Sequence, residues 1–186
     1  LQRPWFVSAK AALGFDMVGP YVFIDKTHVG STMSIKQYGK GGRFVGIWSI
    51  DFTHGSISEQ LASIDVAEGG KVIVLTRGGK VVAHPEGGGV VFGKKGPRIA
   101  NAAFHPDPAL REAWATGFAR DLEFRKSFEF GAWLAMAQPF PEEAGIDWVA
   151  LTLVPRARIL GALDRRLVSA APARAARLRL SLSHAP

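Results

Sequence analysis

Two glycine-rich segments, each set between runs of strand-forming residues, constrain the fold of this chain more than any other feature. The first is Gly39-Lys40-Gly41-Gly42 and the second is Arg77-Gly78-Gly79-Lys80. Glycine-rich turns between apolar runs are typical of β-hairpins, because glycine adopts the positive backbone φ angles that tight turns require. We therefore expect antiparallel strands on both sides of each turn.

The strands expected from the apolar pattern fall into two groups, and the pattern restarts near residues 67–70. The first group has three candidates, at 21–25, 32–38 and 43–52. The second group has five candidates, at 71–76, 80–84, 123–130, 133–138 and 148–154. A loop rich in glycine and proline covers residues 85–97, and its composition argues against regular structure there.

Four helices are expected from apolar spacing and from capping residues. They cover residues 5–13, ending at Gly14; 58–64, with Ser58 as N-cap; 108–120, with Asp107 as cap; and 156–168, as an amphipathic helix. Strands followed by a helix thus occur twice along the chain. We predict an α+β fold of two related units, each an antiparallel sheet with flanking helices, and the first unit lacks its N-terminal elements.

Composition and charge exclude several classes of protein. The 186 residues include no cysteine, which excludes a disulfide scaffold, a thiolate zinc site and a cysteine nucleophile. No stretch approaches the roughly 18 consecutive apolar residues of a membrane span. Residues 155–186 hold seven arginines and one acid, Asp164, and so carry +6 of the net charge of +7. The nearly neutral remainder is not typical of a nucleic-acid binder.

The basic C-terminal segment has two interpretations. It is either a solvated helix with a loose end or a segment that approaches an anionic membrane surface. Residues after Ala170 are rich in Ala, Arg and Ser, and we expect them to contribute little to stability.

Signatures of enzymes and of metal sites are missing from the sequence. There is no phosphate-binding loop, dinucleotide-binding glycine pattern or nucleophile elbow. The five histidines include no pair at the spacing of helical metal ligands, and the prolines in His84-Pro85-Glu86 and His105-Pro106-Asp107 favour turns. A hydrolase or transferase is therefore the weakest interpretation, and we expect no catalytic residue and no metal site.

One set of polar and aromatic residues suits a small ligand. Arg3 presents a planar fork that fits a carboxylate, Trp5 and Phe6 follow it, and Asp51 ends an apolar strand beside Val45 and Ile47. A cation and an anion around aromatic walls suit a small polar or zwitterionic molecule. The alternative is that Arg3 lies on the surface and Asp51 caps the next turn.

Several separated strings resemble the double Cache family of sensor domains, over roughly residues 3–160. They are RPWFVSA at 3–9, PYVF at 20–23, VGIWSID at 45–51, ISEQL at 57–61, VIVL at 72–75 and GKVVAHP at 79–85. These domains are the extracytoplasmic sensors of bacterial transmembrane receptors, which include chemoreceptors, histidine kinases and nucleotide cyclases.

The resemblance implies two PAS-like units and assigns them roles. Residues 1–66 would form a partial, membrane-distal unit that binds the ligand, and residues 67–155 the membrane-proximal unit. Residues 156–186 would form a C-terminal helix and a basic tail towards the membrane. The long N-terminal helix and first strands of the family's distal unit have no counterpart in this sequence.

The resemblance also implies a ligand site. In amino-acid-sensing members, an Arg-x-Trp-aromatic string binds the ligand carboxylate, which Arg3, Trp5 and Phe6 match. An aspartate at the end of the last distal strand binds the amine, and Asp51 matches it. Tyr21 matches an aromatic pocket position. Phe23 stands where those members often carry another aspartate, so a carboxylate ligand without an amine competes with an amino acid.

The leading interpretation is a periplasmic ligand-binding sensor module of a transmembrane receptor that does no chemistry itself and needs no cofactor. Its partner would be a small carboxylate or an amino acid, with no nucleic acid involved. The full-length receptor would be tethered to the inner membrane, with a kinase or nucleotide cyclase as possible output domain. The alternative is a ligand-free scaffold or dimerisation module, in which an apolar stripe on residues 159–167 serves a homodimer.

Overall fold

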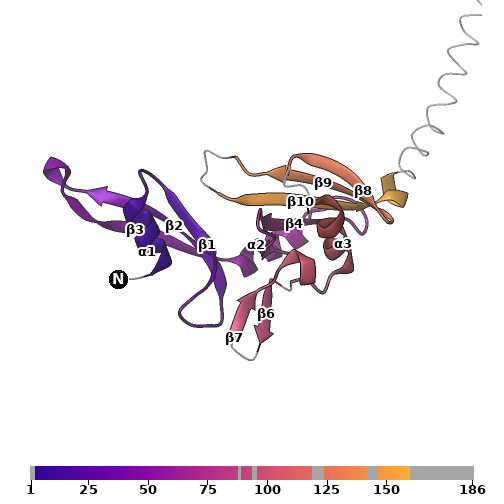
Figure 1. Ribbon diagram of the computed structural model, residues 1–186, viewed down its shortest axis with the longest axis horizontal. Coiled ribbons are helices and arrows are strands. Elements are labelled where there is room, and N and C mark those ends of the chain that lie inside the picture. Colours follow the sequence, from indigo (N-terminus) through magenta and orange to yellow (C-terminus); the bar gives the residue numbers. More distant parts are fainter. Residues whose placement is uncertain (1–2, 88, 94–95, 119–123, 142–145, 160–186) are drawn as a thin grey trace, which may run out of the picture.

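The computed structural model describes residues 3–87, 89–93, 96–118, 124–141 and 146–159. These residues form an α+β fold with three antiparallel sheets, which confirms the predicted fold class. The strands before residue 63 lie in one sheet and those after residue 70 lie in the other two (Figure 1). The boundary between residues 66 and 67, and the roles assigned to the two units, stay predictions.

The first sheet has three strands in the order β1-β2-β3. The strands are β1 (Asp16–Val22), β2 (Val29–Tyr38) and β3 (Phe44–Thr53), and helix α1 (Pro4–Ala11) precedes them. The predicted hairpin joins β2 to β3, and Gly41 and Gly42 in its turn both have a φ of 73°. Strand β1 begins and ends earlier than expected, because residues after Val22 turn back towards β2 instead of extending.

The second sheet has five strands in the order β5-β4-β10-β9-β8. They are β4 (Lys71–Thr76), β5 (Val81–Ala83), β8 (Lys126–Phe130), β9 (Trp133–Pro139) and β10 (Trp148–Pro155). Helix α3 (Pro108–Gly117) packs its buried Leu110 and Ala113 in the main core with Leu151 of the central strand. The predicted cap is confirmed, since the Asp107 side chain accepts from the Ala109 amide at 2.9 Å.

The segment predicted to lack regular structure contains a hairpin instead. Strands β6 (Val90–Gly93) and β7 (Gly96–Ile99) pair as a separate two-stranded sheet. The prediction was wrong because glycine content alone does not prevent strand pairing. The apolar residues of β6 suit a short strand, and β7, which follows it closely in sequence, provides the pairing strand. Val90 pairs with Ile99.

Helix α2 (His54–Ala62) follows β3 directly and lies between the two larger sheets (Figure 1). It begins four residues before the predicted start, with Thr53 as N-cap, so the prediction that Ser58 caps it was wrong. Ser58 lies inside the helix, where its hydroxyl donates to the His54 carbonyl and accepts from the His84 amide. Ile57 packs against a second core cluster that includes Val82. The helix therefore joins the two halves.

The C-terminal helix predicted at residues 156–168 begins within the described residues. Residues 156–159 are helical, and the rest of the predicted helix and the basic tail lie outside the described residues. None of the helices that the described residues form is long and apolar enough to cross a membrane.

Candidate functional site

A pocket of about 200 Å³ lies where the start of α1 meets the ends of β1 and β3. Its lining residues are Arg3, Pro4, Trp5, Tyr21, Phe23, Ile24, Asp25 and Asp51. Five of the six residues predicted for the ligand site are among them. The exception is Phe6, whose ring packs edge-on against Trp5 with a centroid distance of 5.6 Å. Phe6 therefore supports a pocket wall without lining the pocket.

Arg3 is positioned by the first turn of α1. It is the N-cap residue, with extended backbone, and its carbonyl accepts from the amides of Phe6 and Val7 at 3.0 and 3.1 Å. Pro4 suits the position that follows, because the first helical residue needs no amide donor. The Arg3 side chain is half-buried, and no acid among the described residues forms an ion pair with it. Its guanidinium is thus held at the pocket without a protein counter-charge in contact.

Asp51 belongs to a chain of hydrogen bonds across the sheet. Thr32 stands opposite Asp51 in the β2–β3 register, and its hydroxyl donates to Asp51 Oδ1 at 2.6 Å. The Tyr21 hydroxyl is hydrogen-bonded to the same threonine oxygen. Because the threonine proton is committed to the carboxylate, the tyrosine is the donor of that second bond. One carboxylate oxygen of Asp51 remains for a ligand.

The surroundings favour the neutral form of Tyr21. Burial raises the pKa of Tyr21, the hydrogen bond to Thr32 lowers it, and the charge of Asp51 raises it further while that of Arg3 lowers it. The net effect is a raised pKa, so the phenol keeps its proton and serves as a donor at neutral pH.

The sequence-based expectation for the surroundings of Asp51 was wrong. We expected its carboxylate to point into an apolar wall formed with Val45 and Ile47. In the structure Asp51 is exposed and Val45 is 60% exposed. Strand β3 is an edge strand of the three-stranded sheet, so its side chains have a neighbouring strand on one side only.

Phe23 occupies a position fixed by close backbone packing. Its ring lies 5.3 Å from that of Tyr21, centroid to centroid, and against Gly30. A Cβ atom at Gly30 would come within 2.3 Å of both the Phe23 ring and the Phe52 carbonyl oxygen. Glycine at this position therefore lets the phenyl ring close one side of the pocket.

Two polar contributors to the site, Asp25 and Thr32, were not predicted. Asp25 lines the pocket, and its carboxylate accepts from the amides of Thr27 and His28 and contacts the His28 ring. Thr32 orients Asp51 from within the sheet. A register shift between Gln37 and Tyr38 brings Thr32 opposite Asp51, whereas counting back from the glycine turn without that shift would pair Thr32 with Ile50. The turn around Asp25 was hidden by its assignment to a strand.

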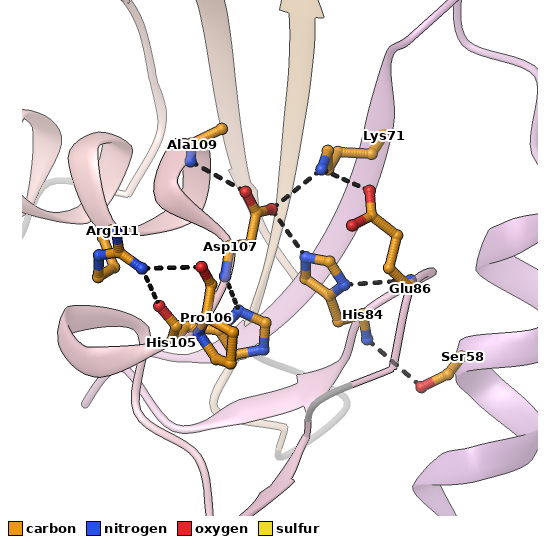
Figure 2. A network of polar contacts seen from close by, with 9 residues as sticks. All are labelled: Ser58, Lys71, His84, Glu86, His105, Pro106, Asp107, Ala109 and Arg111. Atoms are coloured by element: carbon orange, nitrogen blue, oxygen red, sulfur yellow. Dashed lines mark hydrogen bonds and ion pairs between the residues drawn. The ribbon is translucent and has the colours of Figure 1, made fainter.

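A second polar cluster gathers around Asp107 (Figure 2), and none of its residues lines the pocket at Arg3. Asp107 Oδ2 lies 3.0 Å from the Lys71 ammonium and 2.9 Å from His84 Nε2. The other ring nitrogen of His84 accepts from the Glu86 amide at 3.1 Å, so His84 carries its proton on Nε2 and donates it to Asp107. The Lys71 ammonium also reaches the Glu86 carboxylate at 2.7 Å.

These contacts set the charge state of Asp107. Burial alone would raise the pKa of its carboxyl, but the hydrogen bonds from His84 and Lys71 outweigh burial and hold the pKa well below its usual range. The two His-Pro segments thus lie in turns that this ionic cluster fastens to α3 and β4. Within the described ranges, no group of three or more His, Asp or Glu side chains is arranged to hold a metal ion.

Solved structures with a similar fold are ligand-binding domains of amino-acid chemoreceptors. The domain of Pseudomonas aeruginosa PctB in complex with L-Arg has a TM-score of 0.58 and 17% identity, with 90% of this chain and 60% of that domain covered. The domain of PctC from the same organism, in complex with GABA, has a TM-score of 0.57 and 18% identity, with 82% and 60% covered. The chain has the double Cache fold.

The similarity extends to a second organism. The domain of Pseudomonas fluorescens CtaA in complex with L-isoleucine has a TM-score of 0.54 and 16% identity, with 83% of this chain and 57% of that domain covered. The chain therefore spans about 60% of the length of these double Cache domains. No family model and no curated protein matches the sequence.

Proposed function

We propose that this chain is the ligand-sensing part of a transmembrane receptor and that it binds a small amino acid or carboxylate in the pocket at Arg3. The observation that carries the proposal is the placement of an uncompensated cation, Arg3, and an anion, Asp51, in the lining of one aromatic-walled pocket. The chemoreceptor domains of similar fold are in complex with amino acids or GABA, which supports the ligand class.

The charged groups Arg3 and Asp51 and the aromatic walls of the pocket have separate roles in this proposal. The Arg3 guanidinium binds the ligand carboxylate through two parallel hydrogen bonds. The free oxygen of Asp51 accepts from a ligand ammonium, while Thr32 keeps the carboxylate oriented. Trp5, Tyr21 and Phe23 exclude water around the ligand body, which strengthens both charged contacts. The module performs no chemistry and needs no cofactor.

The setting of the module is part of the same proposal. Residues 1–66 are the membrane-distal, ligand-binding unit and residues 67–155 the membrane-proximal unit of a periplasmic sensor, tethered to the inner membrane in the full-length receptor. Helix α2 supports this division, because it follows the last strand of the ligand-bearing sheet and packs on the second core cluster. Ligand binding changes the output only to the extent that two arrangements of the units differ in ligand affinity.

A thermal-shift screen followed by calorimetry tests the proposal. The probes are GABA, a set of L-amino acids and the simple carboxylates of matching length. An amino acid or carboxylate that binds wild type and loses affinity in Arg3→Ala supports the site. Asp51→Asn then separates the classes, because it weakens ligands that bear an amine much more than simple carboxylates. Binding that is unchanged in both variants excludes the site.

A ligand-free dimerisation module is the second candidate function, and one observation favours it. Strand β3 exposes large apolar side chains, among them Trp48 at 67% and Ile50 at 69%. Exposed apolar patches of this kind are typical of interaction surfaces. Sedimentation equilibrium of wild type and Trp48→Ser distinguishes this function, which requires a dimer that the substitution weakens.

A further inference from the structure

A second and larger pocket, of about 490 Å³, lies at the junction of the two halves of the chain. It is bounded by residues 27–29 before and within β2, by residues 53–62 in and around α2, and by parts of the segment 82–90. No lining residue is shared with the pocket at Arg3. A molecule bound here would contact both the first sheet and the loop after β5.

The walls of this junction pocket are suited to a small apolar body. Val29 and Val82 are buried and line it, together with Pro85 and Val90. Its volume falls within the roughly 300–1,000 Å³ typical of small-molecule sites. Apolar surface removed from water in such a pocket supplies most of the binding free energy, while a few polar groups set the class of ligand.

The polar groups of the junction pocket give it negative character. Neither lysine nor arginine is among its lining residues, but Glu59 is. Within the described part of the chain, no ion pair engages the Glu59 carboxylate, whereas the His28 ring is paired with Asp25. A bound carboxylate would therefore meet the charge of Glu59 without a neighbouring cation, and a bound ammonium would find an unpaired acceptor.

The buried histidine of the pocket does not reverse this balance. His54 is 5% exposed, and its Nε2 lies 2.9 Å from the Ser31 hydroxyl oxygen. Burial lowers the pKa of His54 from 6.5 to about 4, so the ring is neutral at physiological pH. Its Nδ1 has no hydrogen-bond partner among the described residues, which leaves a polar group at the pocket unsatisfied.

We propose that the junction pocket binds a small organic amine, with the ammonium at Glu59 and the apolar body against Val29 and Val82. The amine-terminated ligand is favoured over an anion even though Gly55, in the first turn of α2, also lines the pocket. A helix terminus carries only about half a charge, and here Glu59 lies on the same helix with a full opposite charge. A bound amine would bridge the halves that α2 joins.

The test uses three probes with the same phenyl body: phenethylamine, 2-phenylethanol and 3-phenylpropionate. Calorimetry of the whole chain should show phenethylamine binding most tightly and 3-phenylpropionate most weakly. Glu59→Gln should reduce phenethylamine affinity at least about tenfold, which corresponds to about 1.4 kcal/mol. Asp65→Asn, which removes a similar exposed charge outside the pocket, should leave the affinity unchanged.

Two further variants locate the probe. Ala62→Phe places a ring in the pocket at the end of α2 and should abolish phenethylamine binding. Asp51→Asn, which alters the site of the proposed function, should leave it unchanged, so the two proposals fail separately. The amine site would be overturned if wild type did not bind phenethylamine, or if it bound 3-phenylpropionate as tightly as phenethylamine. It would also be overturned if Glu59→Gln bound phenethylamine as tightly as wild type does, or if Asp51→Asn lost phenethylamine binding.

Discussion

The Thr32 hydroxyl donates to Asp51 across the β2–β3 pair, at 2.6 Å, from a side chain that is fully buried. This bond sets the direction of a carboxylate whose own residue is exposed. It also leaves the threonine oxygen as acceptor for Tyr21, so three side chains on adjacent strands are fixed together. The orientation of Asp51 therefore originates inside the sheet.

Thr32→Val preserves the shape of the buried side chain and removes both hydrogen bonds. We expect a loss of about 1–3 kcal/mol of stability, since each of the two hydrogen bonds has a net worth of about 0.5–1.5 kcal/mol. An amino-acid ligand should lose about tenfold in affinity because Asp51 is no longer oriented, whereas a simple carboxylate should lose much less. Calorimetry with both ligand classes, beside urea unfolding, measures the two effects. Equal losses for the two ligand classes would contradict a positioning role for Thr32.

Arg3 variants test the geometry of the proposed carboxylate contact. Arg3→Ala should cost about 2–5 kcal/mol of ligand binding, because the ligand charge is left in the pocket without a partner. Arg3→Lys should recover only part of this loss, since an ammonium cannot reproduce two parallel hydrogen bonds. Lys10→Ala, a change of charge on the same helix outside the pocket, is the control and should leave affinity unchanged. Wild-type ligand affinity in Arg3→Lys would exclude bidentate binding.

The strand pattern was predictable where local signals agreed. Residues 71–76 carry a continuous apolar run next to a glycine turn, and β4 has those bounds. Asp107 directly precedes a segment in which Leu110, Trp114 and Phe118 are spaced at four, and this spacing predicts the cap that α3 has. Both features depend on residues that are neighbours in sequence, so the sequence alone is enough to predict them.

The remaining features depend on contacts between distant residues. Ser58 has the right residue type and position for an N-cap, but its hydroxyl is engaged with the His84 amide from the second half of the chain. The grouping of His84, Lys71 and Asp107 likewise arises from β4, β5 and the start of α3 coming together. Sequence spacing identified the two His-Pro turns and gave no sign that a lysine joins them.

In the ionic cluster, the buried contact of Lys71 with Asp107 should contribute more to stability than the exposed contact of Lys71 with Glu86. Asp107→Asn removes the charge opposite Lys71, whose side chain is only 12% exposed, and should destabilise the fold by about 3–5 kcal/mol. Glu86→Gln is the matched control: its carboxylate is 65% exposed, and its loss should cost at most about 1 kcal/mol. Urea unfolding of the two variants gives the comparison. Similar losses would mean that Asp107 is not the anchor of the cluster.

His54 should make the stability of the fold depend on pH in a defined window. Its pKa is lowered from 6.5 to about 4 in the folded chain by burial, so between these values the unfolded chain binds the extra proton. The free energy of unfolding should therefore fall by about 3 kcal/mol as the pH drops from above 6.5 to about 4, with no further contribution from His54 below that. Asp107, whose pKa is also lowered from the ordinary value of 3.8, loses its contribution mainly below about pH 5, at the acid end of this window. His54→Phe keeps an aromatic ring beside Trp148 and should flatten the curve between pH 6.5 and 4. Urea unfolding at a series of pH values measures both proteins, and an unchanged slope in His54→Phe would assign the pH dependence to other groups.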